Sequence, residues 1–499
     1  MKLALRKISI VGICTLLQIT ITMILYLILG DFFTIIGVIY RLLSIRIILE
    51  IVTKSTKLSS DMPWIIIILM YPIIGTFFYI IIGRNKRSSK LLKRINKNIK
   101  ESKKYLKQND KIKKEIISMK DGSLKYMIDY AKYPATKNNE IEYFSLGDDA
   151  FPKMLEEINK AQKFIFMEYF IIEEGKMWGS ILNILKQKVK EGVEVRFMYD
   201  DVGSITKIPG NYDKYIKSFG IKCIKFNELK PFAGAIMNNR DHRKMTIIDG
   251  KVVFSGGINL ADEYININSK FGHWKDNSIM IKGDAVWTFT VMFLELWNSI
   301  EKEDSNYLKF KNITETKPKE NGYTVPYGIN PLDKEAIGEE VYLNIINEAK
   351  DYVYIYTPYL IIDTDMINAL SLASKRGVDI KIVVPSIPDK KLIYELTKSY
   401  FEELILNNIE IYTYEKGFVH SKVFISDDKV ATVGTINLDY RSLYLHFECG
   451  IYMKNTNVLK DIYKDITETI KKSKKQKIKK QSKIKKLALS FLRLFAPLL

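Results

Sequence analysis

The chain has 499 residues, enough for about three ordinary domains, which excludes a disulfide-stapled miniature. Lys and Arg number 77 against 57 Asp and Glu, and the net charge of +20 indicates a polyanionic partner: nucleic acid, a membrane surface or a phosphorylated substrate. A hydrophobic fraction of 47% excludes a disordered basic tail protein. The three cysteines (Cys14, Cys223 and Cys449) are far apart, which excludes a disulfide framework and a thiolate zinc site.

Two charge-free stretches near the N-terminus are long enough to cross a bilayer. Residues 8–30 and 62–83 contain 23 and 22 residues, and at about 1.5 Å per residue each spans a hydrocarbon core of about 30 Å. Trp64 and Tyr79, near the two ends of the second stretch, are typical of interfacial anchors. We therefore expect residues 1–83 to form a transmembrane helical hairpin. Residues 31–61 either extend the first span or lie along the interface as an amphipathic helix.

The charge beside these stretches predicts their orientation. Residues 84–115 contain 14 basic and 3 acidic residues, and the positive-inside rule places such a juxtamembrane segment on the cytoplasmic side. Two spans return the N-terminus to the same side. We therefore expect a multi-pass protein of the cell membrane, with the rest of the chain and both termini in the cytoplasm.

The C-terminal segment is also basic. Residues 471–499 contain 11 basic and no acidic residues, and they end in an apolar Leu/Phe segment. This composition predicts a basic amphipathic helix on anionic lipid, with a merely solvated tail as the alternative. With both basic segments and residues 1–83 set aside, residues 116–470 carry a net charge of −6.

The central part of the chain contains an internal repeat. The segment HRKMTIIDGKVVFSGGINL (242–260) matches HSKVFISDDKVATVGTINL (420–438) with identical spacing. Upstream of each copy lies a Gly-Val strand pattern, GVEVRFMYDD (192–201) and GVDIKIVVPS (377–386). Strand and helix patterns alternate in both copies, which predicts one α/β domain present twice. We expect these domains at 116–300 and 331–470, with a polar linker at 301–330.

Each copy of the repeat carries a histidine and a lysine two positions apart, His242 with Lys244 and His420 with Lys422. Alternate residues of a strand point to one face, so each imidazole projects beside an ammonium group. A carboxylate follows in a turn between two strands, where it is better suited to hold the loop than to touch substrate; these residues are Asp249 and Asp427.

Small residues and an asparagine complete each copy: Gly256, Gly257 and Asn259, and then Gly434, Thr435 and Asn437. Small residues admit a phosphate close to the backbone, and each asparagine amide can donate a hydrogen bond to it. The chain has four histidines, and we interpret the two outside the repeat, His273 and His446, as structural.

Duplication brings two imidazoles, two ammonium groups and two amides around one pseudo-twofold cleft, a set that suits a phosphodiester. One imidazole can attack phosphorus while the other, protonated, gives its proton to the leaving alkoxide. We expect no metal and no other cofactor, because no carboxylate cluster is visible in the sequence to hold one.

The doubled pattern HxK(x4)D(x6)G[GT]xN resembles the phospholipase D superfamily. The segments YDDVGS (199–204), TPYLI (357–361) and LFAPLL (494–499) are similar to the bacterial cardiolipin synthase family within it. The resemblance implies two pseudo-symmetric phospholipase D-like α/β/α sandwich domains after the transmembrane hairpin. It places six residues in the catalytic motifs: His242, Lys244, Asp249, His420, Lys422 and Asp427.

The resemblance also implies individual roles. His242 would form a phosphatidyl-histidine intermediate and His420 would protonate the departing glycerol, although pseudo-symmetry alone permits the reverse order. The phosphate would be bound by the two lysines together with Asn259 and Asn437. An acid downstream of each motif would orient its histidine, namely Asp276, 34 residues after His242, and Glu448, 28 residues after His420.

The implied reaction converts two phosphatidylglycerols into cardiolipin and glycerol, with phosphatidylglycerol and anionic membrane lipids as partners and no nucleic acid. Three alternatives stay open: a hydrolase in which water takes the intermediate, a nucleic-acid binder or nuclease, and an inactive membrane scaffold. The oligomeric state and the range of donor and acceptor lipids do not follow from the sequence.

Overall fold

The computed structural model describes residues 32–54, 58–83, 90–228, 238–267, 270–301, 306–312, 322–333, 335–479 and 482–498, together with five single positions between 16 and 27. The described residues divide into two units. One unit holds the helices before residue 87 and the residues from Ser490 onward, and the other holds the rest. The first predicted span, 8–30, lies almost entirely outside the described residues.

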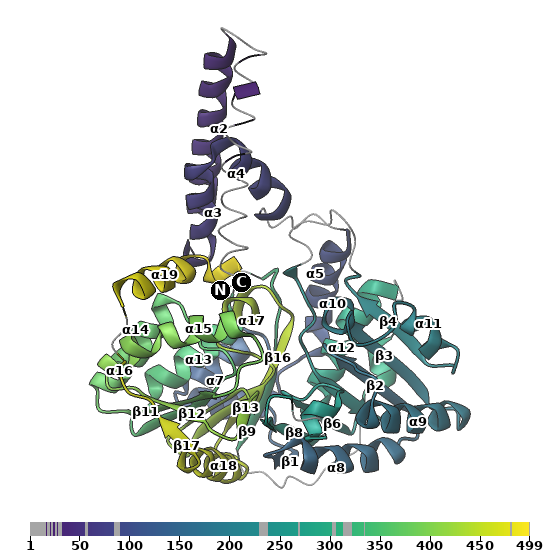
Figure 1. Ribbon diagram of the computed structural model, residues 1–499. Helices are drawn as coiled ribbons and strands as arrows, with labels where there is room; N and C mark the ends of the chain where they lie inside the picture. Colours follow the sequence, from purple (N-terminus) through teal and green to yellow (C-terminus); the bar gives the residue numbers. More distant parts are fainter. Residues whose placement is uncertain are drawn as a thin grey trace. The chain divides into compact units, whose positions relative to one another are not determined.

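The N-terminal unit consists of short and long helices (Figure 1). They are α2 (Phe32–Lys54), α3 (Leu58–Met70), α4 (Pro72–Phe78) and the π-helix η1 (Tyr79–Gly83), with η6 (Ala496–Leu498) near the other end of the chain. Residues 31–61, which the sequence left open, therefore contain a 23-residue helix. Within the described residues, no helix has both the length and the apolar character needed to cross a membrane.

The second predicted span, 62–83, is not one continuous helix. Tyr71 separates α3 from α4 with φ −134° and ψ 74°, outside the helical region. The break has a clear cause, because Pro72 lacks an N–H and its ring disfavours a helical conformation in the preceding residue.

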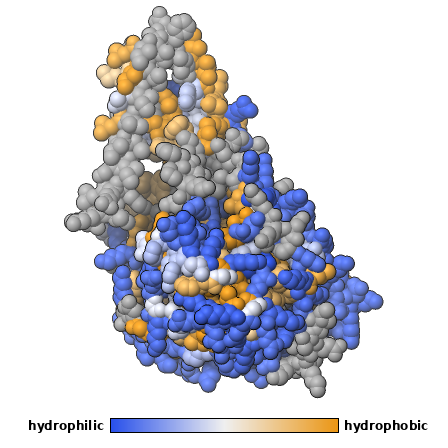
Figure 2. Space-filling model, turned by 90° about the vertical axis from the view of Figure 1, so that its right-hand side faces the viewer, coloured by the Kyte–Doolittle hydropathy of each residue, from blue (hydrophilic) through white to orange (hydrophobic). Residues whose placement is uncertain are grey.

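The two expected interfacial anchors contact each other. The rings of Trp64 and Tyr79 meet edge to face, with centroids 5.7 Å apart. Both pack against a small buried cluster of Ile47, Ile51 and Ile68. The opposite side of α2 is apolar and exposed (Figure 2) through Ile35, Val38, Ile39, Leu42 and Leu49.

The first domain is built on a seven-stranded sheet with strand order β1-β8-β6-β5-β2-β3-β4. Strands β2, β3 and β4 are parallel, and the other neighbours are antiparallel. The strands are β1 (Asn139–Phe144), β2 (Phe164–Tyr169), β3 (Glu194–Asp200), β4 (Lys222–Phe226), β5 (Met245–Ile248), β6 (Val252–Gly256) and β8 (Ser278–Gly283).

Helices cover both faces of this sheet, as alternation along β2 shows. Ile165 and Met167 belong to the core that includes α8 (Gly147–Asn159) and α9 (Lys176–Lys190). Phe166 points the other way and stacks on Phe293 of α12 (Val286–Glu301), with centroids 4.7 Å apart. Strand residues alternate between faces, so the domain is the expected three-layer sandwich. Its smaller elements are α10 (Asp201–Ser204), α11 (Tyr212–Lys217), η4 (Asp262–Ile265), β7 (His273–Lys275) and η5 (Tyr307–Phe310).

The second domain repeats this topology. Its sheet runs β9-β16-β15-β14-β10-β11-β12-β17, so its first seven strands follow the order of the first sheet. The predicted duplication of an α/β domain is therefore confirmed. The strands are β9 (Tyr323–Ile329), β10 (Tyr352–Tyr356), β11 (Asp379–Pro385), β12 (Glu410–Tyr414), β14 (Val423–Ser426), β15 (Val430–Gly434), β16 (Glu448–Lys454) and β17 (Ser473–Lys475).

Two layers of helices flank this sheet as well. Tyr342 of α13 (Ile337–Glu348) stacks on Phe424 of β14, while Tyr463 of α18 (Leu459–Lys471) contacts Tyr352 and Tyr354 of β10. The remaining helices are α14 (Thr364–Lys375), α15 (Lys391–Ser399), α16 (Phe401–Leu406), α17 (Tyr440–Tyr444) and α19 (Lys483–Leu494). Figure 1 shows the two sheets of this unit with their helices.

Segments that the sequence assigned to a linker and a tail contribute strands to the second sheet. Strand β9 lies within the predicted linker 301–330 and pairs with β16. Strand β17 lies within the predicted tail 471–499 and pairs with β12. The polar residues around both strands hid them. Strand β17 has only three polar residues, and Pro326 and Gly328 interrupt the strand pattern of β9.

Residues 90–115 of the predicted juxtamembrane segment 84–115 are likewise folded. Helix α5 (Lys90–Ser102) buries Leu92, Ile95 and Ile99, and its Asn98 Nδ2 donates a 2.9 Å hydrogen bond to Ser299 Oγ at the end of α12. The spacing of three and then four residues makes one apolar stripe among lysines that stay exposed. Three further elements follow along the chain: η2 (Lys103–Tyr105), α6 (Asp110–Ser118) and α7 (Gly122–Asp129).

Candidate active site

The two domains are joined by short parallel strand pairings immediately before the motif histidines. Strand β13 (Gly417–Val419) of the second domain pairs with β7 of the first. His420, which follows β13, donates its backbone N–H to Lys275 O at 2.7 Å. Since Asp276 follows Lys275, this pairing brings an acid of the first domain to a histidine of the second.

The same arrangement occurs in the other half of the site. Asp241 forms a parallel bridge with Phe447, and the backbone N–H of His242 donates to Phe447 O at 2.9 Å. Glu448 is the next residue. An acid of the second domain is thereby placed beside a histidine of the first.

The side chains of the histidines and acids also form hydrogen bonds between the two domains. His242 Nδ1 donates to both carboxylate oxygens of Glu448, at 2.8 and 2.9 Å. His420 Nδ1 donates to Asp276 Oδ2 at 2.6 Å. The expectation that each acid orients the histidine of its own motif is corrected, because the strand pairings cross between domains. Nδ1 is occupied by the acid in both cases, so Nε2 of each imidazole is the nitrogen left for chemistry.

Gly257 and Thr435, two of the small residues of the motif, contact these acids. A Cβ added at Gly257 would lie 2.0 Å from Asp276 Oδ1, so only glycine fits there. At the equivalent position Thr435 donates its hydroxyl to Glu448 Oε2. The sequence interpretation gave these positions to close approach of a phosphate, whereas the structure fills the space with the orienting carboxylates.

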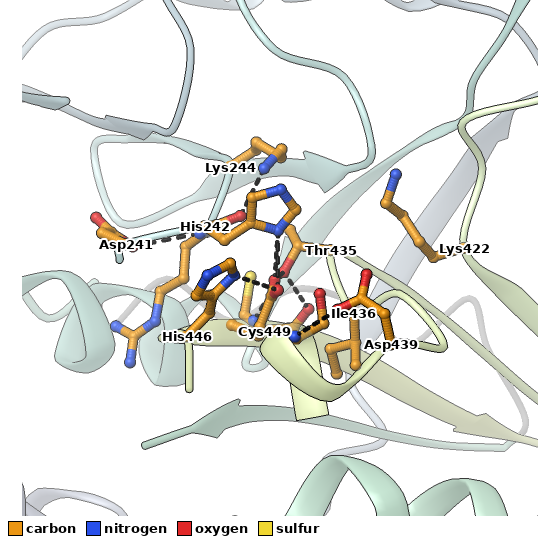
Figure 3. A network of polar contacts seen from close by, with 12 residues as sticks. Asp241, His242, Lys244, Lys422, Thr435, Ile436, Asp439, His446 and Cys449 are labelled. Atoms are coloured by element: carbon orange, nitrogen blue, oxygen red, sulfur yellow. Dashed lines mark hydrogen bonds and ion pairs between the residues drawn. The ribbon is translucent and has the colours of Figure 1, made fainter. Parts of the chain in front are cut away.

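Both motif lysines are buried, and Figure 3 shows Lys244 beside His242. Lys244 Nζ donates to the carbonyl oxygen of His242 at 2.6 Å, and Lys422 Nζ donates to the carbonyl oxygen of His420. Burial lowers the pKa of Lys244 to about 8 and that of Lys422 to about 7. The charge of Lys244 lowers the pKa of Lys422 further, which indicates that both halves share one electrostatic site.

Both histidines are neutral near pH 7 when the site is without an anion. Burial, and then the positive charge of Lys244, lowers the pKa of His242 well below its usual value. Burial, and then Lys422, lowers the pKa of His420 to about 4. The two acids differ. Burial raises the pKa of Glu448 well above its usual value, whereas the charges of His420 and Lys422 outweigh burial and leave the pKa of Asp276 lowered.

The two asparagines occupy different surroundings. Asn259 Oδ1 accepts the backbone N–H of Ile171 at 3.0 Å, and its Nδ2 donates to the hydroxyl of Tyr264 at 2.6 Å. Asn437 is buried, and its Oδ1 has no hydrogen-bond partner among the described residues. Both lie within the motif loops, and their phosphate contacts stay predictions.

The two motif aspartates lie apart from the histidines, beyond the other ends of β5 and β14. Asp249 accepts three backbone N–H groups, from Gln162, Lys163 and Phe164, at 2.7–2.9 Å. Asp427 accepts the equivalent three, from Lys350, Asp351 and Tyr352, at 2.8–3.0 Å. Each carboxylate therefore fixes the start of a central strand, β2 or β10, as the turn position suggested.

Aromatic rings that the sequence reasoning missed enclose both imidazoles. Phe170 and His446 flank His242, with ring centroids 4.8 and 5.6 Å away. Tyr264 and Trp274 flank His420, each at 5.5 Å. Their signal in the sequence is position: Trp274 and His446 each stand two residues before an orienting acid. His446, which the sequence led us to interpret as structural, thus lies in the site beside His242.

The site therefore holds two oriented, neutral imidazoles and two ammonium groups, which suits attack on a phosphodiester. Two duplicated sheets with paired His–Lys motifs define the phospholipase D-like class of proteins. A family model described as "Cardiolipin synthase, PLD-like domain" matches residues 154–297 and 342–472. The chain belongs to this phospholipase D-like cardiolipin synthase family.

Relatives along most of the chain agree with that assignment. An uncharacterized protein of Streptococcus mutans is 45% identical over 460 residues, covering 91% of this chain and 99% of the relative. Cardiolipin synthase 1 of Staphylococcus aureus is 34% identical over 468 residues, covering 89% and 93%. Among solved structures, a phosphatidylserine synthase of Haemophilus influenzae matches with a TM-score of 0.56 at 14% identity, covering 72% of this chain and 93% of that one, which supports the fold.

Replacing Asp249 with alanine should lower the stability of the protein more than its catalytic activity. Three buried or half-buried N–H groups lose a charged acceptor, so we expect the free energy of unfolding to fall by about 3 kcal/mol. Chemical denaturation of the detergent-solubilised protein measures this. Activity per folded molecule should stay within a few-fold of the original, and a loss of several hundred-fold with unchanged stability would contradict a purely structural role.

The lysine pKa values predict that affinity for a phosphodiester falls as pH rises. The ammonium groups are charged below a pKa of about 7 for Lys422 and about 8 for Lys244, and they lose that charge above it. The inhibition constant of a soluble phosphodiester, whose own charge is constant, should weaken by about tenfold per pH unit for each ammonium group lost. A constant value between pH 7 and 9 would contradict this. As a control, the Lys97→Met variant, which removes an exposed lysine outside the site, should show the same pH dependence of the inhibition constant as the original protein.

Proposed function

We propose that this protein is a cardiolipin synthase, which transfers the phosphatidyl group of one phosphatidylglycerol to another. The observation that carries the proposal is the pair of buried imidazoles, each held at Nδ1 by an acid of the opposite domain and each beside a buried lysine. Two equivalent oriented imidazoles suit a two-step transfer in which one attacks and the other moves protons. The similarity to cardiolipin synthase 1 of Staphylococcus aureus supports the same activity.

In the first step, Nε2 of His242 attacks phosphorus, and the bond between phosphorus and the glycerol headgroup oxygen breaks. His420, protonated, gives its proton to the departing alkoxide, which leaves as glycerol. In the second step, neutral His420 takes the proton of a hydroxyl group on the second phosphatidylglycerol. The resulting oxygen attacks phosphorus, the P–N bond breaks, and cardiolipin is released.

The difference between the two acids supports this order of roles. The pKa of Asp276 is lowered by the charges of His420 and Lys422 against the effect of burial, so its carboxylate is charged and stabilises a protonated His420. The pKa of Glu448 is raised well above its usual value by burial. This favours a neutral His242, the form that acts as a nucleophile.

The lysines supply the charge that a buried phosphodiester requires. Taking the anion out of water without compensation would be costly, and two ammonium groups offset its charge and the charge of the transition state. Substrate binding in turn raises the depressed pKa values of the lysines and of His420. The two lysines and His420, which are neutral or only partly charged without substrate, therefore become charged when the substrate is bound.

We also propose that the N-terminal segment anchors the protein in the cell membrane, with the catalytic domains and both termini in the cytoplasm. The support is the pair of charge-free stretches in the sequence, the exposed apolar side of α2 and the basic residues 84–115. A second contact with anionic lipid would come from α19, whose Ile484, Leu487 and Phe491 are exposed among lysines.

Alanine at His242 or at His420 should abolish transfer. Loss of the nucleophile or of the proton donor removes about 10³-fold of the rate or more. Mass spectrometry of the lipids made from phosphatidylglycerol alone measures cardiolipin directly, and Lys97→Ala, at an exposed position of α5, should retain it. Substantial cardiolipin from either active-site variant would overturn the two-histidine mechanism. Phosphatidic acid as the main product of the unaltered protein would support the hydrolase instead.

A solvatochromic label can test whether α19 binds anionic lipid. With Cys14 replaced by serine, a cysteine introduced at Leu487, which is 74% exposed, carries the label. Its emission should shift to the blue on vesicles with phosphatidylglycerol and stay unchanged on neutral phosphatidylcholine. The exposed Lys464 of α18 is the matched control position. No shift at Leu487 on anionic vesicles would make the helix a solvated tail.

A further inference from the structure

His446 is a buried imidazole that the proposed reaction does not use. The residue lies in the site with only 8% of its surface exposed. Among the described residues, neither ring nitrogen has a hydrogen-bond partner. A buried polar group without a partner carries a free-energy cost, so the presence of an imidazole at this position requires an explanation.

Packing against the catalytic histidine does not explain it. The pseudo-twofold repeat places Trp274 at the equivalent position in the other half of the site. The ring of Trp274 lies 5.5 Å from that of His420 at 43°, and the ring of His446 lies 5.6 Å from that of His242 at 41°. A carbon-rich ring thus fills this position in one half, while the imidazole in the other half adds two nitrogens that can act as ligands.

Those nitrogens lie beside two other potential metal ligands. His446 Nδ1 is 3.8 Å from Glu448 Oε1, and the same oxygen is 2.8 Å from His242 Nδ1 (Figure 3). One ligand atom from each of the three residues lies within 4.8 Å of the other two. Two imidazoles and one carboxylate form a ligand set typical of zinc. Thr435 already holds the second oxygen of Glu448, as outer hydrogen bonds do around metal-binding carboxylates.

We propose that His242, His446 and Glu448 form a binding site for a divalent transition metal of the zinc class, and that this metal inhibits the enzyme. The inhibition rests on the proposed function, whereas metal binding does not. The proposed two-histidine steps use no metal, so the site would be regulatory.

Small movements would complete the site. Bonds of about 2.0–2.1 Å to a tetrahedral metal place the ligand atoms about 3.4 Å from one another. The distance from His242 to Glu448 would therefore open slightly and that from His446 would close. The charges of Lys244 and Lys422 oppose a further cation, so we expect weaker binding than at a structural zinc site.

Inhibition follows from the protons of the imidazole. A neutral imidazole carries one N–H, and the contacts of His242 Nδ1 with the carboxylate oxygens of Glu448 assign it to Nδ1. When a metal binds Nδ1, it uses the lone pair of that nitrogen, and the proton must move to Nε2. Nε2 then has no lone pair for attack on phosphorus, so His242 is no longer a nucleophile.

Titration of the full-length protein in detergent with Co²⁺ tests the site without any lipid substrate. Visible absorption bands of tetrahedral Co²⁺ should saturate at one equivalent and disappear on addition of Zn²⁺. His446→Phe, which keeps a ring in place, should weaken Co²⁺ binding by at least about tenfold, and His273→Phe should bind as the original does. Unchanged binding by His446→Phe, or no binding by the unaltered protein, would overturn the proposal.

A second variant, designed from the equivalence of Trp274 and His446, should gain a metal site. Trp274→His would place an imidazole beside His420 and Asp276, and we expect a second equivalent of Co²⁺. If His446→Phe does not fold, a stoichiometry of one in Trp274→His would contradict the ligand geometry.

Cardiolipin production with and without Zn²⁺ tests inhibition separately. The ratio of the two rates should fall at least about tenfold for the original protein and stay near one for His446→Phe, whatever the basal rate of each. Equal sensitivity of both would overturn the inhibitory role. Co²⁺ binding without any cardiolipin production would instead count against the proposed function alone.

Discussion

The crossed hydrogen bonds between each histidine and the acid of the opposite domain are the constraint on which the rest of the site depends. They follow from two short strand pairings, β13 with β7 and Asp241 with Phe447. Each pairing places a histidine and an acid one residue beyond the paired segments. Neither imidazole can therefore be oriented unless the two domains are docked, and the interface between the domains is itself part of the site.

Burial explains the electrostatics of this arrangement. Two imidazoles and two ammonium groups lie in one enclosed site, where low dielectric disfavours every charge and mutual repulsion adds to the effect. The site lowers the pKa values of all four groups. Binding of an anion therefore favours their protonation. A phosphodiester relieves the repulsion, so binding and the protonation needed for the leaving group are coupled.

The sequence predicted the duplicated α/β domains and the residues that meet in the site, because an exact repeat of spacing carries that information. It could not predict the crossing. The distance of Asp276 or Glu448 along the chain favours a partner in the same motif, and only the pairing of distant segments reverses that preference. Strand β17 was missed because its three residues have no apolar pattern, and β9 was missed because Pro326 and Gly328 interrupt its pattern within a polar segment. His446 was missed because an isolated histidine has no periodicity, although its position before Glu448 mirrors that of Trp274.

The order of the residues along the chain has a consequence for synthesis. His242 is made long before Glu448, and Asp276 long before His420, so a ribosome releases neither half of the site in finished form until the last strands have emerged. If the protein is anchored in a membrane of phosphatidylglycerol, as we propose, a partly translated chain that lacks Glu448 and His420 has no oriented imidazole with which to attack that lipid.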